Sequence, residues 1–174
     1  MVDETTNCLV IMGFMGSGKS TLGRSLAKSW QCDFTDLDHY IEASTQMSIS
    51  RIFELHGESG FRKKERLALI EILRSPIPKV LSLGGGTPCF LNNMNEINNL
   101  SRSVYLKLSP KELTRRLHRS HNPRPLLAGK SISELEEYIQ KELCHREQYY
   151  GLAKHIIESD SIRTEDLITF LPRL

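Results

Sequence analysis

The chain has 174 residues, of which 39% are hydrophobic and 25% charged, so we expect one globular domain spanning residues 1–174 and exclude an intrinsically disordered protein. No apolar run reaches the roughly 18 residues that span a bilayer, and the four cysteines are scattered without a CxxC pair, which favours a reduced, cytoplasmic protein with no membrane contact. The formal net charge of +2 gives no general case for nucleic-acid binding, although residues 102–130 hold eight basic side chains and one acidic side chain.

Short apolar runs alternate with stretches that have helical periodicity. The apolar runs predict strands at Cys8–Met12, Cys32–Thr35, Lys79–Leu83, Ser103–Leu108 and His155–Ile157. The periodic stretches predict helices at Lys19–Trp30, His39–Ser44, Ile49–His56, Glu58–Leu73, Ser133–Tyr149 and Thr164–Phe170. One more helix begins at the capping box Ser109-Pro110-Lys111-Glu112 and ends near His118. Strands that alternate with helices indicate an α/β domain with a parallel sheet.

Residues Gly13–Ser20 fit the phosphate-loop pattern G-x-x-x-x-G-K-[ST], between an apolar strand and an amphipathic helix. Glycines let successive backbone N–H groups turn toward an anion, and the start of the helix adds its positive dipole end. We expect Lys19 to bridge the β- and γ-phosphates of a nucleotide and the Ser20 hydroxyl to bind Mg²⁺. The predicted nucleotide-binding residues of this loop are Gly13, Gly16, Ser17, Gly18, Lys19, Ser20 and Thr21. The absence of an N-K-x-D motif, which is typical of guanine-specific proteins of this class, favours ATP.

Two aspartates, Asp36 and Asp38, follow the predicted second strand, near the edge where open parallel sheets bind ligands. Alternate residues of an extended chain point the same way, so both carboxylates are expected to face one site. One would hold Mg²⁺, directly or through water, and the other would accept a proton from a substrate hydroxyl. The alternative is that either aspartate caps the following helix.

A glycine triplet and a helical arginine are further candidates. Gly84-Gly85-Gly86 directly follows a predicted strand and offers backbone donors with no side chain in the way, so we expect a ligand wall rather than a flexible turn. Arg62 and Glu65 lie three positions apart on a predicted helix and can pair. A paired guanidinium is held in a fork that suits a carboxylate, whereas a solvated charged face is the alternative.

The basic side chains between residues 102 and 130 lie on a helix and in the polar loop Arg119–Ile132 that follows it. Because Tyr105, inside a predicted strand, is the one aromatic residue of this segment, base stacking and nucleic-acid binding are poorly supported. In phosphoryl-transfer enzymes such a loop can close as a lid whose arginine neutralises charge on the transferred group. Arg124, in the run Arg124-Pro125-Leu126-Leu127, suits that role.

Together these motifs resemble those of the shikimate kinases, a family of P-loop small-molecule kinases related to nucleoside monophosphate kinases. The matches that follow the P-loop keep the family's order: Asp36-x-Asp38, Phe61-Arg62-x-x-Glu65, Gly84-Gly85-Gly86, Arg124-Pro125-Leu126-Leu127 and Arg146-x-x-Tyr149. The resemblance implies a three-layer P-loop NTPase fold with a five-stranded parallel sheet flanked by helices. It also implies a substrate-binding region at about residues 37–65 and a lid at about residues 119–130.

The resemblance implies phosphorylation of the 3-hydroxyl of shikimate by ATP and Mg²⁺, and we expect a monomer without nucleic-acid partners. It places Asp36 at the magnesium ion and Arg124 at the γ-phosphate, and it makes Lys19, Asp38 and Arg124 the catalytic residues. The substrate-binding residues that it implies are Asp38, Arg62, Glu65, Gly84, Gly85, Gly86 and Arg146.

The lid departs from the family's usual pattern. Arg119 and Arg124 are five positions apart, which is fewer than the family commonly has between the arginine that stacks on adenine and the lid arginine. We assign Arg119 to the adenine, with Arg116 as the alternative, and expect Pro123 to stiffen the lid. Two other functions stay open: another small-molecule kinase, such as a gluconate or nucleotide kinase, and a binding module that does no chemistry.

Overall fold

The computed structural model describes residues 6–120, 129–171 and 173–174. Five strands form one sheet in the order β2-β3-β1-β4-β5, and all four neighbouring pairs are parallel. The strands are β1 (Cys8–Met12), β2 (Asp33–Asp36), β3 (Lys79–Ser82), β4 (Arg102–Lys107) and β5 (His155–Glu158). The α/β class and the five parallel strands expected from the sequence are confirmed.

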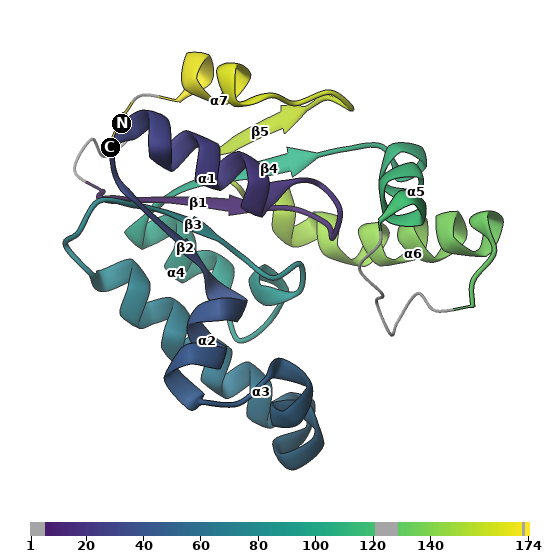
Figure 1. The fold of residues 1–174 in the computed structure, drawn as a ribbon, viewed down its shortest axis with the longest axis horizontal. Coiled ribbons are helices and arrows are strands. Elements are labelled where there is room, and N and C mark those ends of the chain that lie inside the picture. Colours follow the sequence, from purple (N-terminus) through teal and green to yellow (C-terminus); the bar gives the residue numbers. More distant parts are fainter. Residues whose placement is uncertain (1–5, 121–128, 172) are drawn as a thin grey trace.

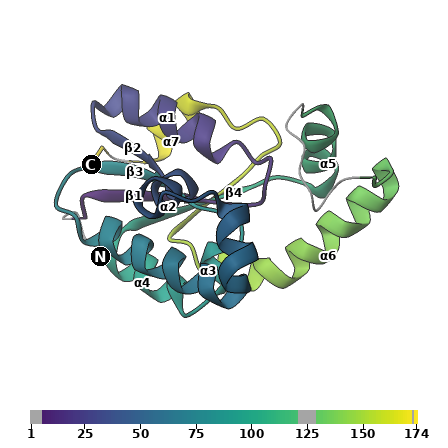
Figure 2. The same ribbon diagram turned by 60° about the horizontal axis from the view of Figure 1, so that its bottom comes forward.

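Helices cover both faces of the sheet and make the three layers (Figures 1 and 2). One face carries α1 (Lys19–Trp30) and α7 (Thr164–Phe170). The other face carries α3 (Ile49–Arg74), α4 (Asn93–Leu100) and α6 (Ile132–Tyr150). Every residue of β1 is buried, because helices cover this central strand on both faces. Burial on both faces requires apolar side chains at every position, which explains the unbroken apolar run. None of the helices in the described part of the chain has the length and apolar character of a membrane span.

Several element boundaries differ from those predicted. Helix α2 (Leu37–Thr45) begins two residues earlier than expected, directly after β2. Helix α3 combines the two predicted helices and kinks at Gly57, where φ is 63°. Ser109 caps α5 (Pro110–Arg119), since its Oγ accepts from the Glu112 N–H at 3.2 Å. The full capping box expected there is wrong, because the Ser109 N–H donates to Asp160 Oδ1 at 2.8 Å instead of to Glu112. Helix α5 ends at Arg119, so the loop that follows it begins one residue later than expected.

The chain between β3 and β4 was not assigned from its sequence, and the structure places a 3₁₀ turn at Thr87–Cys89 and helix α4 there. Helix α4 reads NMNEINNL, and asparagine is a weak helix former, so local propensity does not reveal it. Burial of Met94 and Ile97 against the sheet stabilises it instead.

The register of the central strands brings three loops to one edge of the sheet. Ser82 in β3 pairs with Asp36 in β2 and with Ile11 in β1, so the carboxyl ends of these strands are level. The P-loop, the aspartate pair and the glycine triplet each follow one of these ends. Ligands bind at this edge in open α/β sheets, beside the point where the strand order reverses, which here is β1.

Candidate active site

The backbone conformation of the P-loop depends on its glycines. Gly13, Gly16 and Gly18 have φ angles of 151°, 83° and 94°, which L side chains rarely adopt. An added Cβ at Gly16 would lie 3.0 Å from Leu117 Cγ, so packing also demands glycine there. Lys19 opens α1, and its Nζ donates to the Phe14 carbonyl at 2.8 Å, back across the loop. The structure thus places the Lys19 ammonium group over the turn of the loop, where it could donate hydrogen bonds to a phosphate.

Ser20 and Asp36 meet beside the P-loop. Ser20 Oγ donates to Asp36 Oδ2 at 2.7 Å and lies 3.2 Å from Ser82 Oγ. Asp36 also caps α2, because its Oδ1 accepts from the Asp38 N–H at 3.2 Å. Both sequence interpretations of Asp36 are therefore compatible: one oxygen caps the helix and the other faces the P-loop.

Asp38 lines the same cavity as Asp36, but its backbone conformation differs from the one expected. It lies in the first turn of α2 rather than in extended chain, yet both carboxylates line a cavity of about 460 Å³ together with Lys19 and Gly84. Burial raises the pKa of Asp38 to about 6, and the negative charges of Asp36 and Glu65 act in the same direction, while Lys19 opposes them. Asp38 is thus a carboxylate that accepts a proton more readily than usual.

The glycine triplet touches three of the predicted functional side chains. A Cβ on Gly84 would lie 3.3 Å from Asp38 Oδ1, one on Gly85 would lie 3.0 Å from Arg146 Nη1, and one on Gly86 would lie 2.9 Å from Arg62 Nη2. None of the three glycines has a positive φ, so space rather than backbone conformation requires them. The wall expected from the sequence is therefore a packing surface for two guanidinium groups and a carboxylate.

Arg62 is held on several sides. Its Nη1 donates to Glu65 Oε2 at 2.8 Å, and its guanidinium carbon lies 4.0 Å from the centre of the Phe90 ring. Glu65 is 1% exposed, and its other oxygen accepts from Thr87 Oγ1 at 2.7 Å. Thr87 and Phe90 were missed in the sequence because the segment that contains them carries no motif.

Arg146 projects from α6 toward the same wall. Its Nη2 donates to Glu142 Oε2 at 2.5 Å, and its guanidinium carbon lies 5.1 Å from the centre of the Phe14 ring. The tyrosine that joins it is Tyr150 rather than Tyr149 of the motif, since Tyr150 is fully buried and its hydroxyl donates to the Gly85 carbonyl. One residue of helical rotation decides which of the two tyrosines faces the site.

The two candidate adenine arginines of α5 line different cavities. Arg116 lines the P-loop cavity, and its Nη1 donates to the Ser17 carbonyl at 3.4 Å. Arg119 is exposed and lines a separate cavity of about 550 Å³ that includes Ile132. The geometry favours Arg116 over Arg119. Arg124 lies outside the described residues, as does Pro123.

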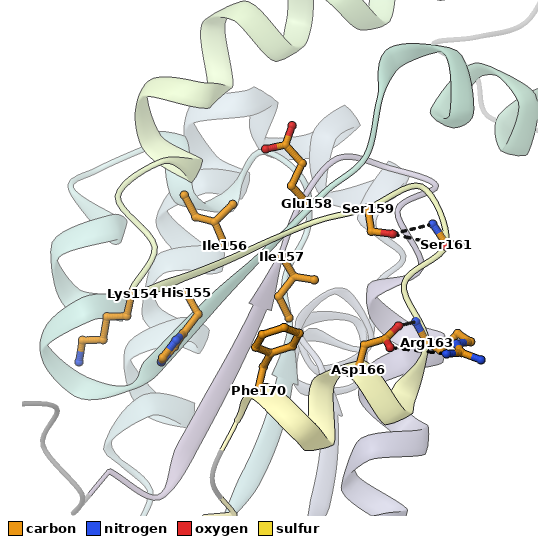
Figure 3. A pocket seen from close by; sticks show the side chains of 10 residues that line it. All are labelled: Lys154, His155, Ile156, Ile157, Glu158, Ser159, Ser161, Arg163, Asp166 and Phe170. Atoms are coloured by element: carbon orange, nitrogen blue, oxygen red, sulfur yellow. Dashed lines mark hydrogen bonds and ion pairs between the residues drawn. The ribbon is translucent and has the colours of Figure 1, made fainter.

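Another cavity, of about 750 Å³, lies along β5 and α7, at the open edge of the sheet (Figure 3). Ile157 and Phe170 pack against one another there, while Ile156 points to the other face of the strand. None of the predicted site residues lines it, and it shares no residue with the P-loop cavity. The size of a cavity therefore does not identify the site. The P-loop cavity is smaller, but Lys19, Asp36 and Asp38 line it.

The family model for shikimate kinase matches residues 15–171 of the chain. The chain belongs to the shikimate kinase family. Shikimate kinase of Flavobacterium johnsoniae is 42% identical over 160 residues, which cover 91% of this chain and 92% of that protein. The crystal structure of shikimate kinase from Bacteroides thetaiotaomicron covers 94% of both chains at 35% identity, with a TM-score of 0.87.

A structure of shikimate kinase from Acinetobacter baumannii in complex with shikimate is similar too. Its sequence identity is 34%, its TM-score is 0.81, and the match covers 96% of this chain and 91% of that chain. Family membership confirms the resemblance drawn from the motifs, and these structures confirm the fold that it implied.

Proposed function

We propose that this chain transfers the γ-phosphoryl group of ATP to the 3-hydroxyl of shikimate and releases shikimate 3-phosphate and ADP. The observation that carries the proposal is that the P-loop, the aspartate pair, Gly84 and Gly85 line one cavity at one edge of the sheet. Arg146 and Arg62 lie directly beside it, against Gly85 and Gly86. A P-loop selects a phosphate chain, and paired arginines select a small carboxylate. A carboxylate between them selects a hydroxyl.

The residues of the P-loop fit a magnesium nucleotide. The described residues contain no cluster of three or more His, Cys, Asp and Glu side chains able to hold a metal by themselves. Mg²⁺ does not need one, because it usually binds one or two protein oxygens and completes its shell with phosphates and water. Ser20 and Asp36, 2.7 Å apart, offer such oxygens. When bound, Mg²⁺ would supply charge neutralisation on the phosphates.

Asp38 would bind the 3-hydroxyl of shikimate and receive its proton. The hydroxyl oxygen forms a bond to the γ-phosphorus, the bond from that phosphorus to the bridging oxygen breaks, and the electron pair leaves with ADP. A carboxylate whose pKa is raised to about 6 is a stronger base than an ordinary aspartate but is still ionised at neutral pH. Lys19 would stabilise the negative charge of the phosphates during transfer.

Arg62 and Arg146 would bind the carboxylate of shikimate from two sides. Glu65 orients Arg62 through its 2.8 Å ion pair, and the glycine wall lets both guanidinium groups approach the backbone at Gly85 and Gly86. Two arginines against one carboxylate give directional, charge-assisted hydrogen bonds, so the substrate would be held with its hydroxyls turned to Asp38.

For the adenine we now prefer Arg116, since it lines the P-loop cavity and Arg119 does not. Arg124 keeps its proposed role at the γ-phosphate on sequence grounds. We further propose one domain over residues 1–174, with substrate contacts at about 37–65 and a lid at about 119–130. We also propose that the protein is a monomer and works in the cytoplasm; its four cysteines are all free, which suits a reducing compartment.

A panel of acceptors tests the proposed function. ADP release would be followed with shikimate, gluconate and a nucleoside monophosphate at equal concentrations. The proposal predicts rapid release with shikimate alone. Faster turnover of gluconate or of the nucleotide would replace it, and nucleotide binding without any acceptor-dependent release would favour the module that does no chemistry.

A further inference from the structure

A buried tyrosine outside the predicted site joins two of its parts. Tyr150, the last residue of α6, has no exposed surface, and its hydroxyl donates to the Gly85 carbonyl across 65 positions of the chain. Its ring packs against Tyr105 with the ring centres 4.9 Å apart. A phenylalanine would make that ring contact equally well, so the hydroxyl has a separate role.

Arg146 lies near the same hydroxyl, against Gly85. Burial raises the pKa of Tyr150, whereas the positive charge of Arg146 lowers it. The Tyr150 hydrogen goes to the Gly85 carbonyl, so the lone pairs of the Tyr150 oxygen are left for the Arg146 guanidinium, which can only donate. The Gly85 carbonyl, the Tyr150 hydroxyl and the Arg146 guanidinium therefore lie together, and the bond to Gly85 fixes the orientation of the phenol.

The hydrogen bond from Tyr150 fixes the backbone of the glycine triplet. The Gly85 carbonyl shares a peptide unit with the N–H of Gly86, and in a trans peptide the two point in opposite directions. Glycines have the freest backbone of all residues, so the peptide between two of them needs an anchor if its N–H is to face one way. Tyr150 supplies that anchor from α6, the helix that also carries Arg146.

We propose that Tyr150 is a positioning residue for the carboxylate of the substrate, because its hydroxyl locks Arg146 and the Gly85–Gly86 peptide in one arrangement. The inference rests on the proposed function, since it concerns the same site. It predicts that loss of the hydroxyl weakens recognition of the carboxylate and leaves phosphoryl transfer intact. A purely structural hydroxyl would instead affect the stability of the fold and leave recognition unchanged.

The test is Tyr150→Phe, with Tyr149→Phe as the matched control, because Tyr149 is the neighbouring residue and is only half-buried. We expect Tyr150→Phe to raise the KM for shikimate roughly tenfold, with kcat within about twofold and the KM for ATP unchanged. Tyr149→Phe should change none of these constants. The Ki of the shikimate carboxamide, a competitor without the negative charge, should rise much less than the KM for shikimate in Tyr150→Phe.

Other outcomes would overturn the inference. A lower melting temperature with an unchanged KM for shikimate would show a structural hydroxyl only. An equal rise for shikimate and its carboxamide would show that Tyr150 does not act on the carboxylate. Failure of the wild-type protein to turn over shikimate would overturn the proposed function itself, and the wild-type assay distinguishes that result from the other two.

Discussion

Asp38 is placed where its charge costs the fold stability, and replacing it with asparagine should therefore stabilise the protein. In the folded state its pKa is raised from 3.8 to about 6, by burial first and then by the charges of Asp36 and Glu65. Two pKa units correspond to about 3 kcal/mol, which is an upper value since the site is partly open to solvent. Asp38→Asn keeps the shape and removes the charge, so it should raise the free energy of unfolding by about 2–3 kcal/mol at pH 8.

The effect should depend on pH in a defined direction. Between about pH 4 and pH 6 the folded state holds the Asp38 proton that the unfolded state has lost, so this residue lowers stability as the pH rises through that window. Well below pH 4 the carboxyl is neutral in both states, so most of the advantage of Asp38→Asn should already be lost at pH 4. Urea unfolding at pH 4, 6 and 8, with EDTA and without nucleotide, measures the difference.

Asp33→Asn is the control, because Asp33 is an exposed acid on β2, three residues before the site. It should leave the unfolding free energy nearly unchanged at every pH. Equal stability of wild type and Asp38→Asn at pH 8 would refute the reasoning. A stabilisation of the same size at pH 4 would also refute it, because the cause would then be packing rather than charge.

Three further substitutions, one of them paired with a control, test the rest of the site. Arg62→Lys loses the fork that pairs with buried Glu65, so KM for shikimate in a steady-state assay should rise by about one order of magnitude or more. Gly85→Ala places a Cβ 3.0 Å from Arg146 Nη1 and should also raise that KM, with an unchanged circular dichroism spectrum. Arg116→Ala should raise the KM for ATP by about one order of magnitude, whereas Arg119→Ala should leave it near the wild-type value.

The fold was largely predictable because the strongest signals in the chain are local. The run Cys8–Met12 is apolar at every position, as a strand enclosed on both faces must be, and the P-loop sequence requires a strand before it and a helix after it. Helix α4 was not predictable, since its asparagines favour no helix and its stability comes from contacts with distant parts of the chain.

The sequence named several side chains that the structure brings together, but it did not define how they are arranged. The sequence indicated that Asp36 and Asp38 face one site. The expectation that both lie in extended chain was wrong, because α2 begins at Leu37. The choice between Tyr149 and Tyr150 depends on the rotation of α6 against β4, to which Tyr105 contributes. Packing between elements far apart in sequence sets the rotation of a helix. A sequence motif that fits either of two neighbouring tyrosines therefore cannot tell which of them faces the site.

The most direct test of the central claim is ADP release that depends on shikimate, measured with and without Mg²⁺. Wild-type protein with ATP, Mg²⁺ and shikimate should release one ADP for each shikimate 3-phosphate formed, and omission of either shikimate or Mg²⁺ should reduce the rate to background. A rate that is the same with and without shikimate would contradict the account.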